Sequence, residues 1–144
     1  MADDGLKVSE VMRTDLYAID GLASIADALA LMRRHSISSL VIEPRHPGDE
    51  YGFITVNEIA SRVIAVNKSM KRTSVYEIMD KPILTVHPDM RVRYAVRLLS
   101  QLARRRALVR GEGGLQGFVS LRDLVLSYAE AAVRKEEADA QPRA

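Results

Sequence analysis

The feature that most constrains the fold of this chain is an internal repeat at an offset of 67 residues. The segment Val8–Met12 recurs as Val75–Met79, and the short strand-forming run Leu16–Ile19 recurs as Ile83–Val86. A helix face follows in each copy, marked by apolar residues at i, i+3, i+4 and i+7. These residues are Ile25, Ala28, Leu29 and Met32 in the first copy and Val92, Ala95, Val96 and Leu99 in the second.

Each copy reads as strand, helix, strand, strand, helix, which predicts an α+β fold of two β-α-β-β-α repeats. A unit of about 55 residues leaves one side of its sheet uncovered, so we expect the copies to pack sheet to sheet about a pseudo-twofold axis. We place the first repeat at 7–66, a polar, basic linker at 67–74 and the second repeat at 75–130. Residues 131–144 have little apolar surface to bury, and we expect a disordered tail there.

Composition excludes several function classes. The chain has no cysteine, which rules out disulfides and thiolate catalysis, and its three histidines lack ligand spacing, so no metal site is predicted. Its apolar runs are too short to span a membrane or to form a signal core, which indicates a cytoplasmic protein. Up to Asn67 there are 6 Lys+Arg against 10 Asp+Glu, and after it 15 against 9. This asymmetry suits an anionic ligand or a self-complementary association.

A second repeated motif, Gly-x-φ-(Thr/Ser)-x-x-(Asp/Glu), lies at Gly52–Glu58 and at Gly117–Asp123. Together with the two Met-containing starts and the Ile83–Val86 run, it resembles the cystathionine β-synthase (CBS) domain over residues 7–130. The resemblance implies a non-catalytic sensor module with clefts between paired repeats that bind adenosine derivatives. It also implies a homodimer that uses the apolar helix faces of the repeats, such as those with Leu29 and Val96.

The resemblance also implies site residues. Asp123 is expected to bind the ribose hydroxyls, and Ser120 and Thr85 are expected to contact phosphate. The same positions in the first repeat are Glu58, Thr55 and Ala18, a weaker first site because Glu58 is longer and Ala18 has no hydroxyl. Independently, Ser120 stands where a strand turns into a helix, whose first N–H groups favour anions. The predicted nucleotide-binding residues are Thr85, Ser120, Arg122, Asp123, Ile83 and Arg106.

Both motifs are also capping boxes, in which a hydroxyl and an acid satisfy the backbone of a helix start. A purely structural dimerisation and interaction module with empty clefts is therefore the alternative. We predict AMP, ADP or ATP as the ligand, with NAD compatible and S-adenosylmethionine disfavoured by the basic second half. Nucleic-acid binding is not predicted, because no aromatic residue interleaves with the arginines. The regulated partner protein is not identified by the sequence.

Overall fold

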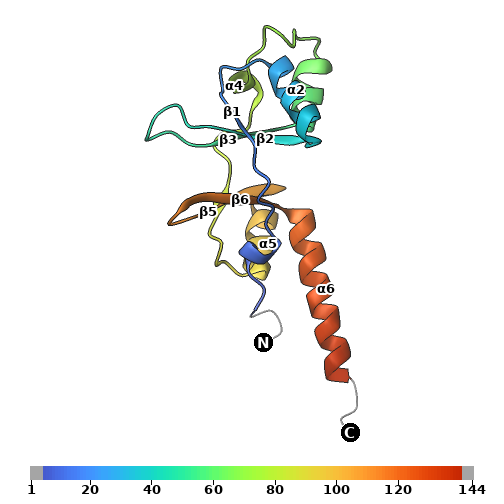
Figure 1. Ribbon diagram of the computed structural model, residues 1–144. Helices are drawn as coiled ribbons and strands as arrows, with labels where there is room; N and C mark the ends of the chain where they lie inside the picture. The colour runs from blue at the N-terminus through green and yellow to red at the C-terminus, as the bar shows by residue number, and fades with distance from the viewer. Residues whose placement is uncertain (1–4, 141–144) are drawn as a thin grey trace. The chain divides into compact units, whose positions relative to one another are not determined.

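The computed structural model describes residues 5–140 and consists of two compact units. One, the first-sheet unit, comprises Leu16–Ile83; the other, the second-sheet unit, combines Met1–Asp15 with Leu84–Ala144 (Figure 1). Each unit contains one three-stranded sheet with helices, which confirms the predicted α+β class and its two repeats.

The first-sheet unit has the strand order β1-β2-β3, in which β1 is parallel and β3 antiparallel to β2. One face of this sheet is covered by helices, and the apolar face of α2 enters the core through Ile25, Ala28 and Met32. Its elements are β1 (Ala18–Ile19), α2 (Ile25–His35), β2 (Ser39–Ile42), β3 (Gly52–Thr55), α3 (Val56–Ile59), the π-helical η1 (Ala60–Ile64) and α4 (Val75–Ile78).

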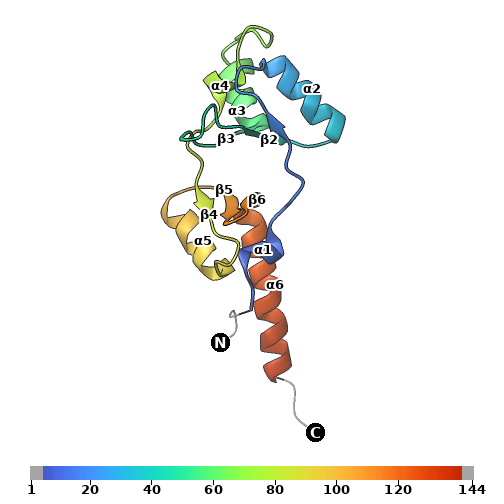
Figure 2. The same ribbon diagram turned by 60° about the vertical axis from the view of Figure 1, so that its left-hand side comes forward.

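The second-sheet unit repeats this arrangement with the order β4-β5-β6. Its core gathers Val92, Ala95 and Leu99 from one helix with Val86, Val109 and other strand residues. Its elements are α1 (Val8–Val11), β4 (Thr85–Val86), α5 (Val92–Gln101), β5 (Arg106–Gly111), β6 (Gly114–Ser120) and α6 (Leu121–Ala140), seen from a second direction in Figure 2.

The two Met-containing starts are exchanged between the units. Helix α1 opens the first repeat in sequence, yet Val8 is buried in the second-sheet core and its N–H donates to the Met90 carbonyl at 2.9 Å. Helix α4 opens the second repeat, yet Val75 is buried in the first-sheet core and donates to the Ala23 carbonyl at 2.8 Å. The compact units therefore differ from the sequence repeats at their starts.

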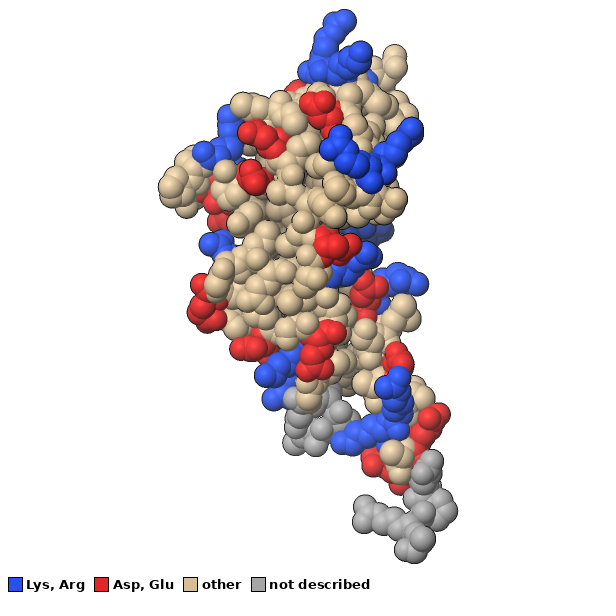
Figure 3. All heavy atoms as spheres, viewed as in Figure 1, with Lys and Arg blue, Asp and Glu red and all other residues tan. Residues whose placement is uncertain are grey.

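This exchange redistributes the charge. The first-sheet unit has 8 Lys+Arg and 8 Asp+Glu, and the second-sheet unit has 13 and 11. The strong polarity between the halves of the sequence is thus not a polarity between the units, because acidic residues before position 16 join the basic half. Figure 3 shows both signs interspersed over the visible face.

Both motif glycines lie where a second segment crosses the sheet. A Cβ on Gly52 would collide with the Met79 sulfur, and one on Gly117 would collide with the Arg13 carbonyl oxygen. The segments that follow the Met-containing starts form isolated bridges here, Phe53 with Asp80 and Phe118 with Arg13. At Gly117 glycine is required because the crossing backbone approaches too closely for a side chain, whereas at Gly52 the close neighbour is the Met79 side chain, which can move.

Helix α6 differs from the expected tail. Residues 131–140 continue the helix, whereas the sequence predicted disorder from residue 131, and residues 141–144 lie outside the described part. Alanine, glutamate, arginine and lysine dominate this segment and have high helix propensity. Arg134 also forms an i, i+4 ion pair with Glu130.

The helix faces that the resemblance placed partly at a dimer interface are largely internal. Ile25, Met32, Val92 and Leu99 are buried in the cores of their own units. Leu29 and Val96 on the same faces are only half-buried, so a contact with a second chain through them stays a prediction.

Candidate functional site

Three of the predicted site residues share one face of the second sheet. Arg106 lies directly opposite Ser120, and Thr85 lies opposite Leu108, two residues beyond Arg106 on β5. Opposed residues and residues two apart on one strand point to the same side of a sheet. Thr85, Arg106 and Ser120 are thus neighbours on one face of the sheet. The strand residues of the core, such as Ala107 and Val119, lie on the opposite face.

Ser120 also starts α6, and its Oγ accepts a hydrogen bond of 3.0 Å from the Asp123 N–H. The next N–H, of Leu121, donates to the Arg105 carbonyl at 2.8 Å. Arg122 is largely exposed, and its Nη1 lies 3.6 Å from Asp123 Oδ1. The start of a helix concentrates partial positive charge, and here it stands next to two arginines and two hydroxyls.

Asp123 has a second cationic neighbour that the sequence did not single out. Arg13 donates to Asp15 at 3.0 Å, and this hydrogen bond is the main cause that raises the pKa of its guanidinium. The carboxylate of Asp123 adds a smaller Coulombic contribution in the same direction. The Arg13 guanidinium also lies 5.9 Å from the centre of the Phe118 ring. The repeat could have indicated this position, because Arg13 is equivalent to Asp80 at the offset of 67 residues. Both residues form an isolated β-bridge with a phenylalanine of a motif strand.

The corresponding residues of the first repeat are arranged differently. Thr55 is buried, its Oγ1 accepts from the Asn57 N–H at 3.1 Å, and its own N–H donates to Glu58 Oε1 at 2.7 Å. Hydroxyl and carboxylate thus form a complete capping box. Ala18 lies on β1 opposite Val41 and offers no side-chain donor.

The two sites differ most at the acid. Within residues 5–140, no hydrogen bond joins the Asp123 carboxylate to the Ser120 backbone N–H, whereas Glu58 accepts that bond from Thr55. Ser120 therefore caps α6 with its hydroxyl, while the carboxylate of Asp123 takes no part in the cap and lies 3.6 Å from the Arg122 guanidinium. Five of the six predicted residues lie in the second-sheet unit, and Ile83, half-buried just before β4, belongs to the first-sheet unit.

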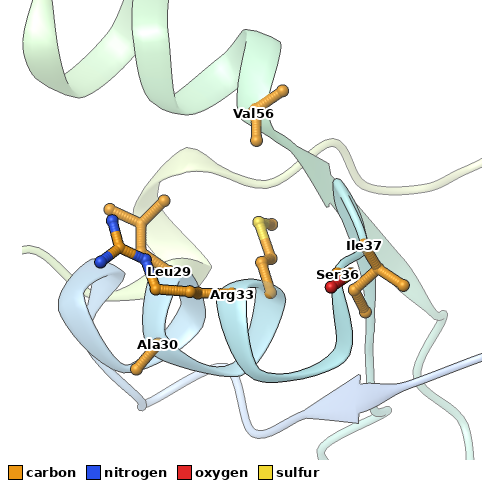
Figure 4. A pocket seen from close by; sticks show the side chains of 7 residues that line it. Leu29, Ala30, Arg33, Ser36, Ile37 and Val56 are labelled. Carbon is orange, nitrogen blue, oxygen red and sulfur yellow. The ribbon is translucent and has the colours of Figure 1, made fainter.

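A separate open groove of about 540 Å³ lies between α2 and the start of α3 (Figure 4). Its walls are mostly apolar, and it contains none of the residues predicted to bind nucleotide. Arg33 is the charged side chain at this groove. The lining residues are Leu29, Ala30, Met32, Arg33, Ser36, Ile37 and Val56.

Comparison with known families decides the relationship. The family model of the CBS domain matches the chain twice, at residues 8–65 and 75–130. The chain belongs to the CBS-domain family. This confirms the resemblance, and the tandem CBS domains are of a kind commonly found as regulatory modules in signal-transduction proteins.

The CBS relatives include small proteins of several lineages. An uncharacterised protein of Methanopyrus kandleri, MK0525, is 30% identical over 91% of this chain and 68% of its own length. The CBS domain-containing protein YhcV of Bacillus subtilis is 27% identical over 83% of this chain and 84% of its own length. The mitochondrial CBSX3 of Arabidopsis thaliana is 28% identical over 82% of this chain, which spans 62% of that relative.

Two solved CBS structures are similar in fold. The hexameric CBS-CP12 protein from bloom-forming cyanobacteria is 33% identical with a TM-score of 0.79, over 93% of this chain and 80% of that chain. The CBS domain of a bacterial CNNM/CorC family Mg²⁺ transporter, solved in complex with ATP, is 25% identical with a TM-score of 0.70, over 90% and 89%. No helix among residues 5–140 is long and apolar enough to cross a membrane.

Proposed function

We propose that this CBS-domain chain is a non-catalytic regulatory module that binds an adenine nucleotide at the second-sheet unit. The observation that carries the proposal is the shared sheet face of Thr85, Arg106 and Ser120 beside an acid that the helix cap does not use. The ATP complex of the related transporter domain supports the ligand class.

In this proposal Asp123 accepts hydrogen bonds from the ribose hydroxyls. Thr85 and Ser120 donate hydroxyl hydrogen bonds to phosphate, and the guanidinium groups of Arg106 and Arg122 add charge-assisted bonds. This donor set favours AMP, ADP and ATP, accommodates NAD, and disfavours the positively charged S-adenosylmethionine.

The nucleotide changes the surface that the module presents to a partner protein, because a ligand shifts a conformational equilibrium by its differential affinity for the two states. We further propose that the chain self-associates as a homodimer and acts in the cytoplasm without catalysing a reaction. The hexameric CBS-CP12 neighbour supports self-association.

Thermal unfolding with ATP, ADP, AMP, NAD and S-adenosylmethionine tests the ligand. A nucleotide at 100 times its Kd should stabilise the fold by about 2.7 kcal/mol, a rise in Tm of roughly 5–10 °C. The Asp123→Asn variant should lose this rise, and Glu58→Gln, which can still cap, is the matched control that should retain it. A panel without effect on the wild-type chain would contradict nucleotide binding.

One observation favours the structural alternative, in which the module dimerises with empty sites. Ser120 does accept the Asp123 N–H, as a cap alone would require. If no nucleotide changes the unfolding curve and Asp123→Asn unfolds like the wild type, the motif is a helix cap and this alternative holds.

A further inference from the structure

The second-sheet unit contains one strongly basic segment. Between Asp89 and Glu112 the chain has seven arginines and neither an acidic residue nor a lysine. This segment comprises helix α5, the turn that follows it and strand β5. The whole unit has 13 Lys+Arg and 11 Asp+Glu, so without the segment it would keep 6 basic against 11 acidic residues. The positive charge of the unit is therefore local to this segment.

The exposed side of α5 carries part of this charge. Arg93 and Arg97 are exposed and lie four residues apart, which places them on one side of the helix. Arg104, also exposed, follows the helix, and its N–H donates to the Leu99 carbonyl at 2.9 Å. This bond holds Arg104 at the C-terminal end of α5, where a cation is favoured. We call Arg93, Tyr94, Arg97 and Arg104 the α5 basic surface.

The guanidinium groups of this surface are suited to an external anion. Within residues 5–140, no carboxylate pairs with Arg97 or Arg104. Arg93 lies against Tyr94, a 48% exposed residue: its Nη2 donates to the tyrosine hydroxyl at 3.1 Å, and its guanidinium is 4.9 Å from the ring centre. A guanidinium that stacks through its plane can still donate from its edge, so the stack orients Arg93 without occupying all of its donors.

We propose that the α5 basic surface binds a short acidic segment of the partner protein that the module regulates. Arginine is the residue that binds a carboxylate through two parallel hydrogen bonds, and the segment has no lysine. Arg93 and Arg97 are about 6 Å apart along the helix axis, the spacing of two acids at i and i+4 on a partner helix. This inference rests on the proposed regulatory function and names the chemistry of its partner.

The surroundings of the surface favour a short acidic segment over a long polyanion. From Arg93 to Arg104 the surface is only about 17 Å long. Helix α6, which packs against α5, has five acidic and three basic residues, so a nucleic acid or an anionic membrane extending past the surface would meet like charge. Tyr94 is its one aromatic side chain, whereas proteins that bind single-stranded nucleic acid stack successive bases on several.

Fluorescence anisotropy with a labelled synthetic helical peptide tests the proposal. The probe carries three glutamates, at i, i+4 and i+11, and a second peptide with glutamines at these positions is its control. The wild-type chain should bind the glutamate peptide only, and the triple exchange Arg93→Gln, Arg97→Gln and Arg104→Gln should weaken binding about tenfold. Replacing the same three arginines with lysine should give an intermediate affinity, because the charge remains but the paired hydrogen bonds do not.

A second triple variant separates the surface from net charge. Lys68→Gln, Lys71→Gln and Arg72→Gln remove the same charge from exposed positions of the first-sheet unit, and this variant should bind the peptide like the wild type. Equal losses in the two glutamine variants, or a wild-type chain that does not bind the glutamate peptide, would overturn the proposal.

Two other occupants have their own signatures. A single-stranded RNA probe that binds more tightly than the peptide through the same arginines would assign the surface to nucleic acid. A wild-type dimer that dissociates in the arginine-to-glutamine variant in sedimentation would assign it to a second copy. Either result overturns the proposal. The rise in Tm with ATP reports separately on the ligand site and should persist in this variant; peptide binding without any effect of nucleotide would contradict nucleotide binding but support the acidic partner.

Discussion

The sharpest consequence of the proposed site is that the two equivalent acids of the repeat, Glu58 and Asp123, should have opposite roles. The Thr55 N–H donates to Glu58 Oε1 at 2.7 Å and so completes a capping box, whereas the Asp123 carboxylate does not accept the Ser120 N–H among the described residues. Replacing Glu58 with alanine therefore removes a helix cap and should lower the free energy of unfolding by about 0.5–2 kcal/mol. Its effect on nucleotide affinity should be small.

Replacing Asp123 with alanine should give the reverse pattern. A charged hydrogen-bond partner of a ribose contributes about 1.5–3 kcal/mol, which corresponds to a loss of roughly one to two decades in affinity. The Ser120 Oγ accepts its capping bond from the backbone N–H of residue 123, which the substitution keeps. The loss of stability should therefore be smaller than for Glu58→Ala.

Urea unfolding and isothermal titration with ATP, applied to both variants, measure the two quantities separately. The account predicts a stability defect in Glu58→Ala and an affinity defect in Asp123→Ala. Equal losses of affinity in the two variants would show that the first repeat binds nucleotide despite its closed box. A large loss of stability in Asp123→Ala with unchanged affinity would show that Asp123 is only a capping residue.

Three further outcomes follow from the fold. Gly117→Ala should destabilise the chain by about 1–3 kcal/mol in urea unfolding, because its Cβ would overpack against the Arg13 backbone; Gly52→Ala should cost less, because the Met79 side chain can move, and Gly113→Ala, with open space around its Cβ, is the control. Lys81 Nζ lies 2.6 Å from the Asp49 carboxylate and lowers the pKa of that group. The pair should therefore stabilise the fold above pH 3.8, the ordinary pKa of Asp49, and lose this contribution as the pH falls further. Lys81→Met should remove this part of the dependence of stability on acid pH. Deleting residues 134–144 should change the Tm little, since the described part of this segment is mostly exposed; a large decrease in Tm would contradict this expectation.

The repeat pattern predicted the strands, the long helices and their apolar faces, but not the short helices α1 and α4 or the π-helical η1. Ile25 and Met32, and their counterparts Val92 and Leu99, are all buried where the spacing placed them in helices. Periodicity reports which face of a helix is apolar, but it does not report what covers that face. The dimer contact expected on these faces, through the half-buried Leu29 and Val96, stays a prediction.

The exchange of α1 and α4 could not be predicted from the repeat. Val8 and Val75 occupy equivalent positions in nearly identical segments, so either could complete either core. Side-chain length led to the prediction that Glu58 binds a ribose less well than Asp123, and this stays a prediction. Only the hydrogen-bond geometry shows that the longer acid reaches the Thr55 N–H and closes the cap.

A crystal structure grown at saturating ATP tests the central claim most directly. The account predicts one nucleotide per chain at the second-sheet unit, with its ribose hydroxyls bound to Asp123 and its phosphates within hydrogen-bond distance of Thr85 and Ser120. A nucleotide bound at Thr55 and Glu58 instead, or density showing ATP at neither position, would contradict it.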